Sequence, residues 1–539
     1  MRKCLLIAAA AIGTAAVLFT TGFARAEEHA SGEAGYLKSA TYYSDDWVIN
    51  FWNSESKHME EELAQIREDG FNNIILAVPW REFQPGISPC TYNDYAWEKL
   101  DRVMNAASAQ NLSVMLRVGY TWDYAGRDNV LERYKKLMYD VSAQKAWMEY
   151  VGRLYERASA HENFCGGFLT WEDFWNFTDS SADLGNTVEG RRLAQASGYT
   201  DYARANYSLE ELSKMYGHSI RSYEELYFPD QSSYARRVFY EFYDQFLNDM
   251  LVMSQTVFPG LSMEVRLDAD PVNRQDGIKE GFMHTSTYPC GSAAYTSAMY
   301  SVSMGFENKN ERVSAAEALE KAPVFFNRLR VYSGGKPAYI DQLLFTDNTI
   351  GYEHNAQLQD DQKALYLEGL APILKNMTMG YGIWTYRDYG DNKLFNAQFA
   401  LGSEGWMLSG GSYLTEWEGS KALLLLEGGS VSQSIGNRMT GAIGENAFVR
   451  FKAESEDSSR ITIKLGGRVR TVEVQGSRTV EVQFRGCRVG DLSISVSGGT
   501  PVYVDDIQVY TFVTQGELYN LDGTEGACIE ALRRMNQNL

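Results

Sequence analysis

The most constraining feature of the sequence is an alternation, from about residue 42 to residue 395, between short apolar runs and segments of helical periodicity. The runs at 73–78 and 113–118 are apolar throughout rather than alternating in polarity, as expected for strands buried on both faces. Parallel strands separated by outer helices produce this pattern. It predicts an α/β fold with a (β/α)8 TIM barrel at about residues 40–402.

We expect eight strands, which is within the range of an elaborated barrel. They are expected at residues 47–52, 73–78, 113–118, 167–172, 261–266, 281–284, 337–341 and 382–386. A long, mostly helical insertion follows the fourth strand and extends to about residue 260. Within it, Ser208 and Glu211 have the spacing of a capping box at a helix start.

Near residue 403 the helical periodicity ends, and short alternating strands separated by glycine-containing turns follow. This change predicts a C-terminal β-sandwich, a jelly roll, at residues 403–513. The last segment, 514–539, returns to a helical pattern with Leu532 and Met535, and we expect it to dock on one of the two domains.

The N-terminus has the features of a targeting segment. Arg2 and Lys3 precede an apolar stretch at 5–19, and Ala24 and Ala26 supply small residues at the spacing that signal peptidase requires. We therefore expect a cleaved, bacterial-type signal peptide over the first 26 residues, and a secreted, cell-surface or periplasmic protein. A retained anchor is the alternative, but the stretch is shorter than the ~20 residues that span a bilayer.

Composition restricts the class of ligand. Aromatic residues make up 13% of the chain, with 11 Trp and 34 Tyr, and flat rings with a polar tip suit stacking on sugars or bases. The formal net charge of −20 would repel a phosphate backbone, so nucleic acid is excluded and a neutral ligand is favoured.

Several other chemistries lack their motifs. The six His residues show no pair at metal-ligand spacing, and there is no phosphate-binding loop, dinucleotide fingerprint or serine nucleophile elbow. We therefore expect neither a metal nor a cofactor. The widely scattered cysteines argue against a disulfide framework, with at most one or two bridges.

Polar and aromatic side chains gather where the expected strands end, which is where a barrel of this type places its active groups. Aromatic faces stack on pyranose rings, while Arg and carboxylate groups bind hydroxyls, so the set suits a sugar. The candidate substrate-binding residues are Trp80, Arg81, Arg117, Trp122, Trp175, His284, Tyr288, Gln342, Trp384 and Arg387. For each Trp the alternative is packing between strand and helix.

Glu172 is the strongest single catalytic candidate. It ends an apolar strand between Trp171 and Trp175, where desolvation would raise its pKa, as a general acid for glycosidic cleavage requires. The alternative is a structural carboxylate paired with Arg117.

The motif Trp80-Arg81-Glu82-Phe83-Gln84-Pro85-Gly86, followed by Tyr92, by 97–101 and by 112–114, resembles the second-strand region of the retaining (β/α)8 glycoside hydrolases of clan A, especially family 42 β-galactosidases. Residues 208–217 and 222–225 are similar to that family's insertion. The resemblance covers about residues 45–395. It implies an acid/base at Glu172, although Trp171 replaces the usual Asn, and it places Gln342 where the nucleophilic Glu is expected.

An amide cannot act as that nucleophile, and three alternatives follow. Asp341 is the nucleophile if a one-residue shift or bulge turns it into the mouth. A second possibility is that another carboxylate pairs with Glu172, as in an inverting enzyme. Its candidates are Glu264, Asp268 and Asp270. The third is that Gln342 marks a barrel that binds sugar without cleaving it.

The C-terminal domain offers another aromatic group. The segment Val504-Asp505-Asp506-Ile507-Gln508-Val509-Tyr510 resembles the last strand of jelly-roll carbohydrate-binding modules. Trp406, Tyr413 and Trp417 either form a sugar platform or seal the contact between barrel and sandwich.

Together these features predict a secreted glycoside hydrolase that cleaves a β-linked oligo- or polysaccharide, with Glu172 and Asp341 as its catalytic carboxylates. The alternative is a non-catalytic carbohydrate-binding protein on a degenerate hydrolase barrel, an accessory to exopolysaccharide handling. The fold leaves sugar identity and linkage open, because loop shape sets both.

Overall fold

The computed structural model describes residues 35–56, 58–120, 130–170, 173–174, 181–264, 269–284, 295–300, 310–336, 338–346, 356–435, 446–486, 490–513 and 517–539. The expected signal peptide lies outside this part of the chain.

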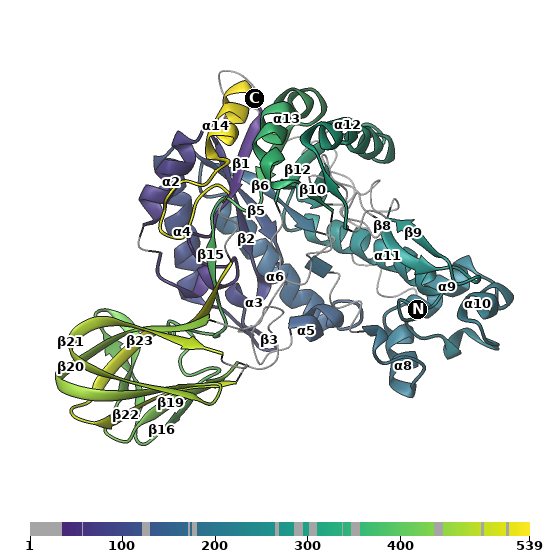
Figure 1. The fold of residues 1–539 in the computed structure, drawn as a ribbon. Coiled ribbons are helices and arrows are strands. Elements are labelled where there is room, and N and C mark those ends of the chain that lie inside the picture. The colour runs from purple at the N-terminus through teal and green to yellow at the C-terminus, as the bar shows by residue number, and fades with distance from the viewer. Residues whose placement is uncertain are drawn as a thin grey trace.

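Eight parallel strands close into a barrel, which confirms the predicted (β/α)8 fold (Figure 1). Around the barrel the order is β1-β14-β12-β10-β7-β6-β5-β2. The strands are β1 (Leu37–Thr41), β2 (Asn73–Val78), β5 (Ser113–Val118), β6 (Phe164–Thr170), β7 (Ser262–Glu264), β10 (Tyr295–Tyr300), β12 (Ala338–Leu344) and β14 (Gly380–Ile383).

Two of the expected strands are wrong. The apolar run at 47–52 is a buried loop that continues into the short helix η2 (Asn50–Asn53), and the first strand is β1. β1 lacks an apolar run because Ser39 points into the barrel, where it bonds to Asn73 and Tyr339. The run at 281–284 overlaps β9 (Lys279–Met283), which forms an antiparallel hairpin with β8 (Ala269–Asn273) outside the barrel.

Helices cover the outside of the barrel. The longer ones are α2 (Met59–Glu68), α4 (Asp94–Ala109), α6 (Val141–Ala158), α11 (Arg236–Gln255), α12 (Ala315–Tyr332) and α13 (Lys363–Met377). The short elements are α3 (Trp80–Phe83), α5 (Val130–Lys136), η6 (Asp360–Gln362), β3 (Gly86–Ile87), β4 (Cys90–Thr91), β11 (Arg312–Val313) and β13 (Gln357–Leu358). α2 buries Met59, Leu63 and Ile66, and Gly70 follows it with a φ of 88°.

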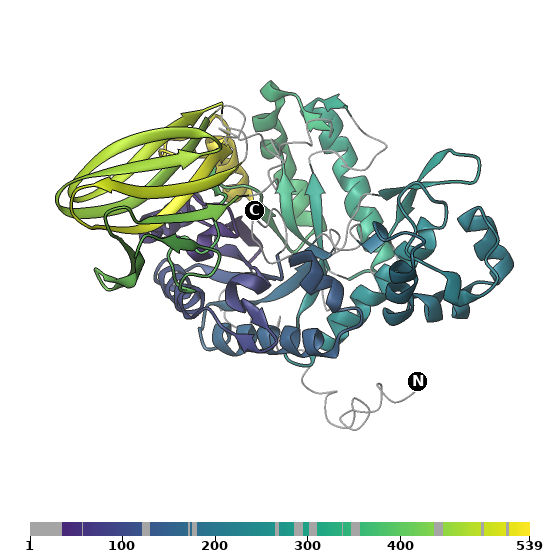
Figure 2. The same cartoon turned by 90° about the horizontal axis from the view of Figure 1, so that it is seen from below.

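The helical insertion forms a lobe on the side of the barrel opposite the sandwich (Figures 1 and 2). It contains α8 (Val188–Ala196), α9 (Tyr199–Asn206), α10 (Leu209–Tyr216), η3 (Tyr223–Glu225) and the β8–β9 hairpin. The predicted capping box at Ser208 and Glu211 is present.

The C-terminal strands form the predicted β-sandwich, which has a hydrophobic core of its own. All pairs are antiparallel, and β20 pairs with three neighbours along its length. The strands are β15 (Tyr389–Asn392), β16 (Met407–Ser409), β17 (Tyr413–Trp417), β18 (Ser420–Leu425), β19 (Ser430–Ser434), β20 (Asn446–Leu465), β21 (Arg468–Arg485), β22 (Asp491–Gly498) and β23 (Val502–Val513).

The barrel and the sandwich are joined through β15, which leaves the barrel after β14 and pairs with the last sandwich strand, β23. The backbone N–H of Trp47 donates to the Gly390 carbonyl over 3.0 Å, which ties the loop after β1 to the same strand. Glu55, at the end of that loop, forms an ion pair with Lys452 of the sandwich.

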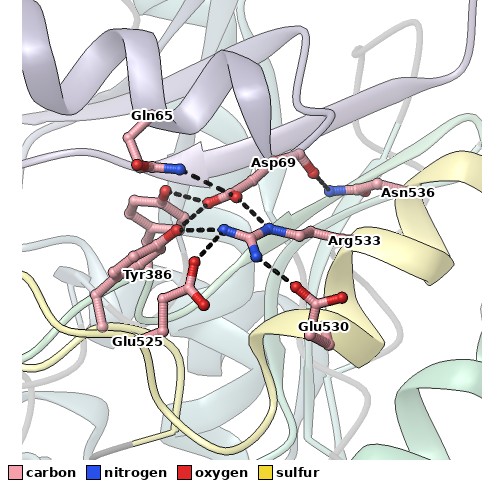
Figure 3. Close-up of polar contacts among 8 residues, drawn as sticks. Gln65, Asp69, Tyr386, Glu525, Glu530, Arg533 and Asn536 are labelled. Carbon is pink, nitrogen blue, oxygen red and sulfur yellow. Dashed lines mark hydrogen bonds and ion pairs between the residues drawn. The ribbon is translucent and has the colours of Figure 1, made fainter.

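The tail returns to the barrel. Helix α14 (Ile529–Asn538) packs along α13, at the end of the barrel that lies away from the sandwich in Figure 1. Asp69, which follows α2, is fully buried there and accepts hydrogen bonds from Arg533, Tyr386 and Tyr519 (Figure 3). Asn536 donates to the Asp69 carbonyl and its own carbonyl accepts from Lys38. In the part of the chain that the structure describes, no helix is long and apolar enough to span a membrane.

Candidate active site

The carboxyl ends of the barrel strands are surrounded by a group of aromatic rings, which we call the mouth wall. It consists of Tyr43, Trp47, Tyr120, Trp384 and Tyr389. Trp47 stacks on Tyr389 with ring centres 4.8 Å apart, and meets Trp384 edge to face at 5.7 Å and Tyr120 at 6.0 Å. Tyr43 and Tyr120 follow β1 and β5, and Trp384 follows β14 directly, so three strand ends place the wall.

Trp47 brings a buried donor to this wall. Its side chain belongs to a residue only 7% exposed, and its indole N–H has no acceptor among the described residues. A buried N–H without an acceptor costs ~1–3 kcal/mol. The sequence analysis missed this residue as a site candidate because it lay inside a run interpreted as a strand.

A buried ion pair lies beside the wall. Arg117, on β5, forks onto Asp173 over 3.1 and 3.2 Å, and both side chains are almost fully buried. The guanidinium carbon lies 4.9 Å from the ring centre of Tyr120 and 5.7 Å from that of Trp384. Asp173 is held in turn by its backbone N–H, which donates to Thr170. Sequence reasoning considered Arg117 as a partner of Glu172, but Asp173, the next residue, forms the ion pair described here.

Strand β12, which carries Asp341 and Gln342, is bulged. Against β10, the three-residue step from Tyr339 to Gln342 spans only Thr296 to Ala298. Against β14, the step from Ile340 to Leu343 spans only Tyr381 to Ile383. One extra residue therefore lies on β12 at Asp341–Gln342, and the pairing with both neighbouring strands shows it.

The bulge matters because it breaks the in-and-out alternation of the strand. Tyr339 points into the barrel, where its hydroxyl donates to or accepts from Ser39 over 2.7 Å. Asp341, two residues later, is 1% exposed, and Gln342 is 5% exposed. The bulge falls at the two residues that compete for the nucleophile's position, and both of them are buried.

The charges of four carboxylates act on Tyr243 of α11. Burial and then the negative charges of Asp244, Asp173, Asp270 and Glu264 raise the pKa of the Tyr243 hydroxyl well above its usual value. Glu264 is fully buried at the end of β7, between Thr170 of β6 and Thr296 of β10 in the sheet register. Glu264 thus comes from the barrel sheet, Asp244 from α11 and Asp270 from the lobe hairpin.

His284 lies between two of these carboxylates. One ring nitrogen is 2.8 Å from Asp244 and the other is 3.1 Å from Asp270. Burial alone would lower the pKa of His284, but the two carboxylates outweigh it and raise the pKa to about 9. Asp270, a candidate second carboxylate, is therefore engaged with His284, which joins the lobe hairpin to α11.

Three other predicted site residues have partners elsewhere. Trp80 is fully buried, its indole N–H donates to Gln84, and its ring contacts Tyr134 and Trp147 rather than the mouth wall. Arg81 lies over the ring of Phe395, 3.6 Å from its centre. Arg387 forms an ion pair with Glu62 over 2.6 Å. Among the ring contacts of the described residues, none joins Trp80 to the mouth wall. Burial raises the pKa of the Tyr43 hydroxyl in that wall, and the positive charge of Arg387 partly offsets this effect.

The remaining predicted residues lie outside the described residues: Glu172, Trp122, Trp175, Tyr288 and Asp268. Within the described ranges, no group of three or more His, Cys, Asp or Glu side chains is arranged to hold a metal ion. Cys90, Cys165 and Cys528 carry free thiols. Of the aromatic group in the sandwich, Trp406 is 6% exposed and donates to Asn396, so it packs in the core.

No protein-family model matches the sequence, and a comparison with curated proteins found no relative. Solved structures with a similar chain path include a β-galactosidase from the psychrophilic Marinomonas ef1, at 14% identity and a TM-score of 0.44, covering 65% of this chain and 54% of that one. A GH5_18 protein from Streptomyces cattleya in complex with GlcNAc has 12% identity and a TM-score of 0.41, covering 66% and 71%. An exo-β-1,4-mannosidase from Opitutaceae bacterium strain TAV5 has 12% identity and a TM-score of 0.39, covering 66% and 52%.

The aligned part thus spans only about half the length of the β-galactosidase and of the mannosidase. The resemblance to family 42 remains a prediction. We therefore base the proposed function on the residues of the mouth.

Proposed function

We propose that the protein is an exported glycoside hydrolase that cleaves a β-linked oligo- or polysaccharide, with Glu172 as proton donor and Asp341 as the second carboxylate. The observation that carries this proposal is the bulge at Asp341–Gln342 in β12, the barrel strand that ends at Leu344. Asp341 lies two residues after the inward-pointing Tyr339, and the extra residue falls where Asp341 and Gln342 compete for the nucleophile's position.

The chemistry needs two carboxyl groups on opposite sides of the scissile bond. Glu172 donates a proton to the glycosidic oxygen as the bond to the anomeric carbon breaks. The Asp341 carboxylate attacks that carbon, and water, deprotonated by Glu172, then releases the sugar. This retaining route needs a carboxyl separation of ~5 Å, whereas an inverting route would need ~6.5–9.5 Å.

The mouth wall supports recognition of a neutral sugar. Its rings are buried, none more than 8% exposed, and the buried Arg117–Asp173 pair lies beside them, so the site combines apolar ring faces with charged hydrogen-bonding groups. The Trp47 N–H, which lacks an acceptor among the described residues, would donate to a sugar hydroxyl. Such a bond would recover in the complex the free energy that the buried donor costs in the free protein.

The test is hydrolysis of a panel of aryl β-glycosides and β-linked oligosaccharides by the wild type and by Glu172→Gln. We expect the variant to lose at least ~10³-fold in kcat on unactivated substrates, because proton donation contributes mainly in the transition state. Glu210→Gln, at an exposed glutamate of the lobe, is the matched control. Full turnover by Glu172→Gln would exclude Glu172 as the acid, and no turnover of any substrate by the wild type would contradict the proposal.

Export is proposed from the leader alone. Expression of the full chain in a bacterial host should yield a mature protein whose N-terminus lies near Glu27, because Ala24 and Ala26 fit the cleavage site. N-terminal sequencing of exported material checks this, and a sequence beginning at Met1 would contradict it.

A further inference from the structure

One face of the sandwich carries a row of aromatic and polar side chains that the barrel chemistry does not use. In the sheet register Tyr413 of β17 is opposite Leu424 of β18, Leu424 is opposite Tyr503 of β23, and Tyr503 is opposite Glu454 of β20. Directly opposed residues share a face of a sheet. These four residues therefore form one row across four strands, which we call the sandwich row.

The row lies on the outer face. Leu423, Val504 and Ala453, each next in sequence to a row member, are fully buried in the sandwich core. Successive side chains of a strand point to opposite faces, so the row points away from that core. Tyr413 is 48% exposed, and Tyr503 and Glu454 are partly exposed.

Trp417 extends the row with a second ring. It stacks on Tyr503 with ring centres 5.8 Å apart and planes 22° apart, and its indole N–H donates to the Glu454 carboxylate over 3.1 Å. The hydrogen bond fixes the indole, so two flat rings are held in one orientation while both stay partly exposed. Rigid rings with fixed faces lose little entropy when a ligand stacks on them.

The row borders the contact between sandwich and barrel. Lys452, two residues from Glu454 on the same face of β20, forms an ion pair with Glu55. Glu55 ends the loop that carries Trp47, and the eight residue-to-residue steps from Trp47 to Glu55 limit their separation to ~28 Å. A long ligand that enters the mouth can therefore also pass over the row.

We propose that the sandwich row and Trp417 form a second carbohydrate-binding surface, which holds a neutral β-linked polysaccharide while another part of the same chain occupies the mouth. Stacked rings suit the apolar faces of sugars, and the Glu454 carboxylate accepts from hydroxyls. The chain's formal charge of −20 disfavours a polyanion as the occupant. The statement that the bound polymer is also the substrate rests on the proposed function, whereas the statement that the row binds a polymer does not.

Affinity electrophoresis of the full chain in gels containing glucomannan, β-1,4-galactan, barley β-glucan or xylan tests this surface. We expect at least one polymer to retard the wild type, and Trp417→Ala and Tyr503→Ala to weaken that retardation at least fivefold. Trp417→Phe, which keeps a ring, should lose less. Met407→Ala, which removes an exposed apolar side chain of β16, is the control and should bind as the wild type does.

Two further measurements separate the outcomes. Circular dichroism and thermal melting show whether each variant is folded, and turnover of aryl glycosides should be unchanged in Trp417→Ala while KM for the polymer rises. If retardation depends on Trp417 but the protein hydrolyses no substrate, the second binding surface is supported and the proposed function is contradicted. Absence of retardation by every polymer, or equal retardation of wild type and both alanine variants, would overturn the second surface.

Discussion

The two ends of the barrel differ in how completely their buried polar groups are paired. At the end covered by α14, Asp69 accepts from an arginine, two tyrosines and a glutamine, and Asn536 bonds to Asp69, Tyr381 and Lys38 (Figure 3). At the mouth, Arg117 pairs with Asp173 and His284 lies between Asp244 and Asp270, but the Trp47 indole N–H has no acceptor within the described part of the chain.

Paired polar groups stabilise a fold, whereas a buried donor without an acceptor costs free energy. The closed end therefore contributes to stability and the mouth wall carries a cost, which is how barrel enzymes divide their two faces. Substitutions in the mouth wall should change activity more than stability, and substitutions at the closed end should do the reverse.

The largest expected effect is at β12. Asp341→Asn should lower kcat on aryl β-glycosides at least ~10³-fold, because an amide cannot form the covalent intermediate. Gln342→Glu is the paired variant and should add no activity if Asp341 is the nucleophile. Steady-state kinetics and product stereochemistry check both, and a gain of activity in Gln342→Glu with an unaffected Asp341→Asn would assign the role to position 342 instead.

At the closed end, Arg533→Ala should lower the free energy of unfolding by ~3 kcal/mol, because it leaves the buried Asp69 carboxylate without its cation. The neighbouring Arg534 pairs with Glu368 at the exposed surface, so Arg534→Ala should cost less than ~1 kcal/mol. Urea unfolding measures the difference, and kcat should stay unchanged in both. Equal stabilities of the two variants would show that α14 does not seal the barrel through Asp69.

His284 should make stability depend on pH. Its pKa is raised in the folded protein to about 9, so its contribution is complete below the unfolded pKa of ~6.5 and is lost as the pH rises through 9. We expect the free energy of unfolding to fall by ~3 kcal/mol over this interval from this residue. His284→Gln should remove that slope, whereas His218→Gln, at an exposed residue of the lobe, should keep it. The same slope in all three proteins would contradict the assignment.

The smallest expected effect is at the mouth wall. Trp47→Phe keeps a ring but deletes the N–H, so kcat/KM should fall about fivefold, the equivalent of one hydrogen bond of ~1 kcal/mol, with no loss of stability. Trp406→Phe is the mirror-image control, because its N–H donates to Asn396 in the sandwich. That variant should lose ~1 kcal/mol of stability and no activity. A destabilised Trp47→Phe with unchanged kinetics would make Trp47 a packing residue.

The sequence predicted the architecture because strands buried on both faces have continuous apolar runs and their covering helices have apolar faces. The sequence did not predict β1, because Ser39 interrupts its apolar pattern to form hydrogen bonds inside the barrel. It also predicted a strand at Trp47, where the aromatic run belongs to a buried loop. The bulge of β12 could be proposed from the sequence but not predicted from it, because a bulge is defined by how the strand pairs with its neighbours β10 and β14. The pairing of Arg117 with Asp173 likewise depends on the three-dimensional path of the chain after β6, which the sequence pattern does not give.

The pairing of β15 with β23 also has a kinetic consequence. About 150 residues separate the last barrel strand from α14. Tyr389 nevertheless lies opposite Val513, so the segment that enters the sandwich and the segment that leaves it are adjacent. A sandwich that folds first shortens the loop that α14 must close to about twenty residues, which lowers the closure cost by ~2 kcal/mol. The folded sandwich then holds the two ends of the intervening chain close together. Variants that slow the folding of the sandwich should therefore delay the docking of α14.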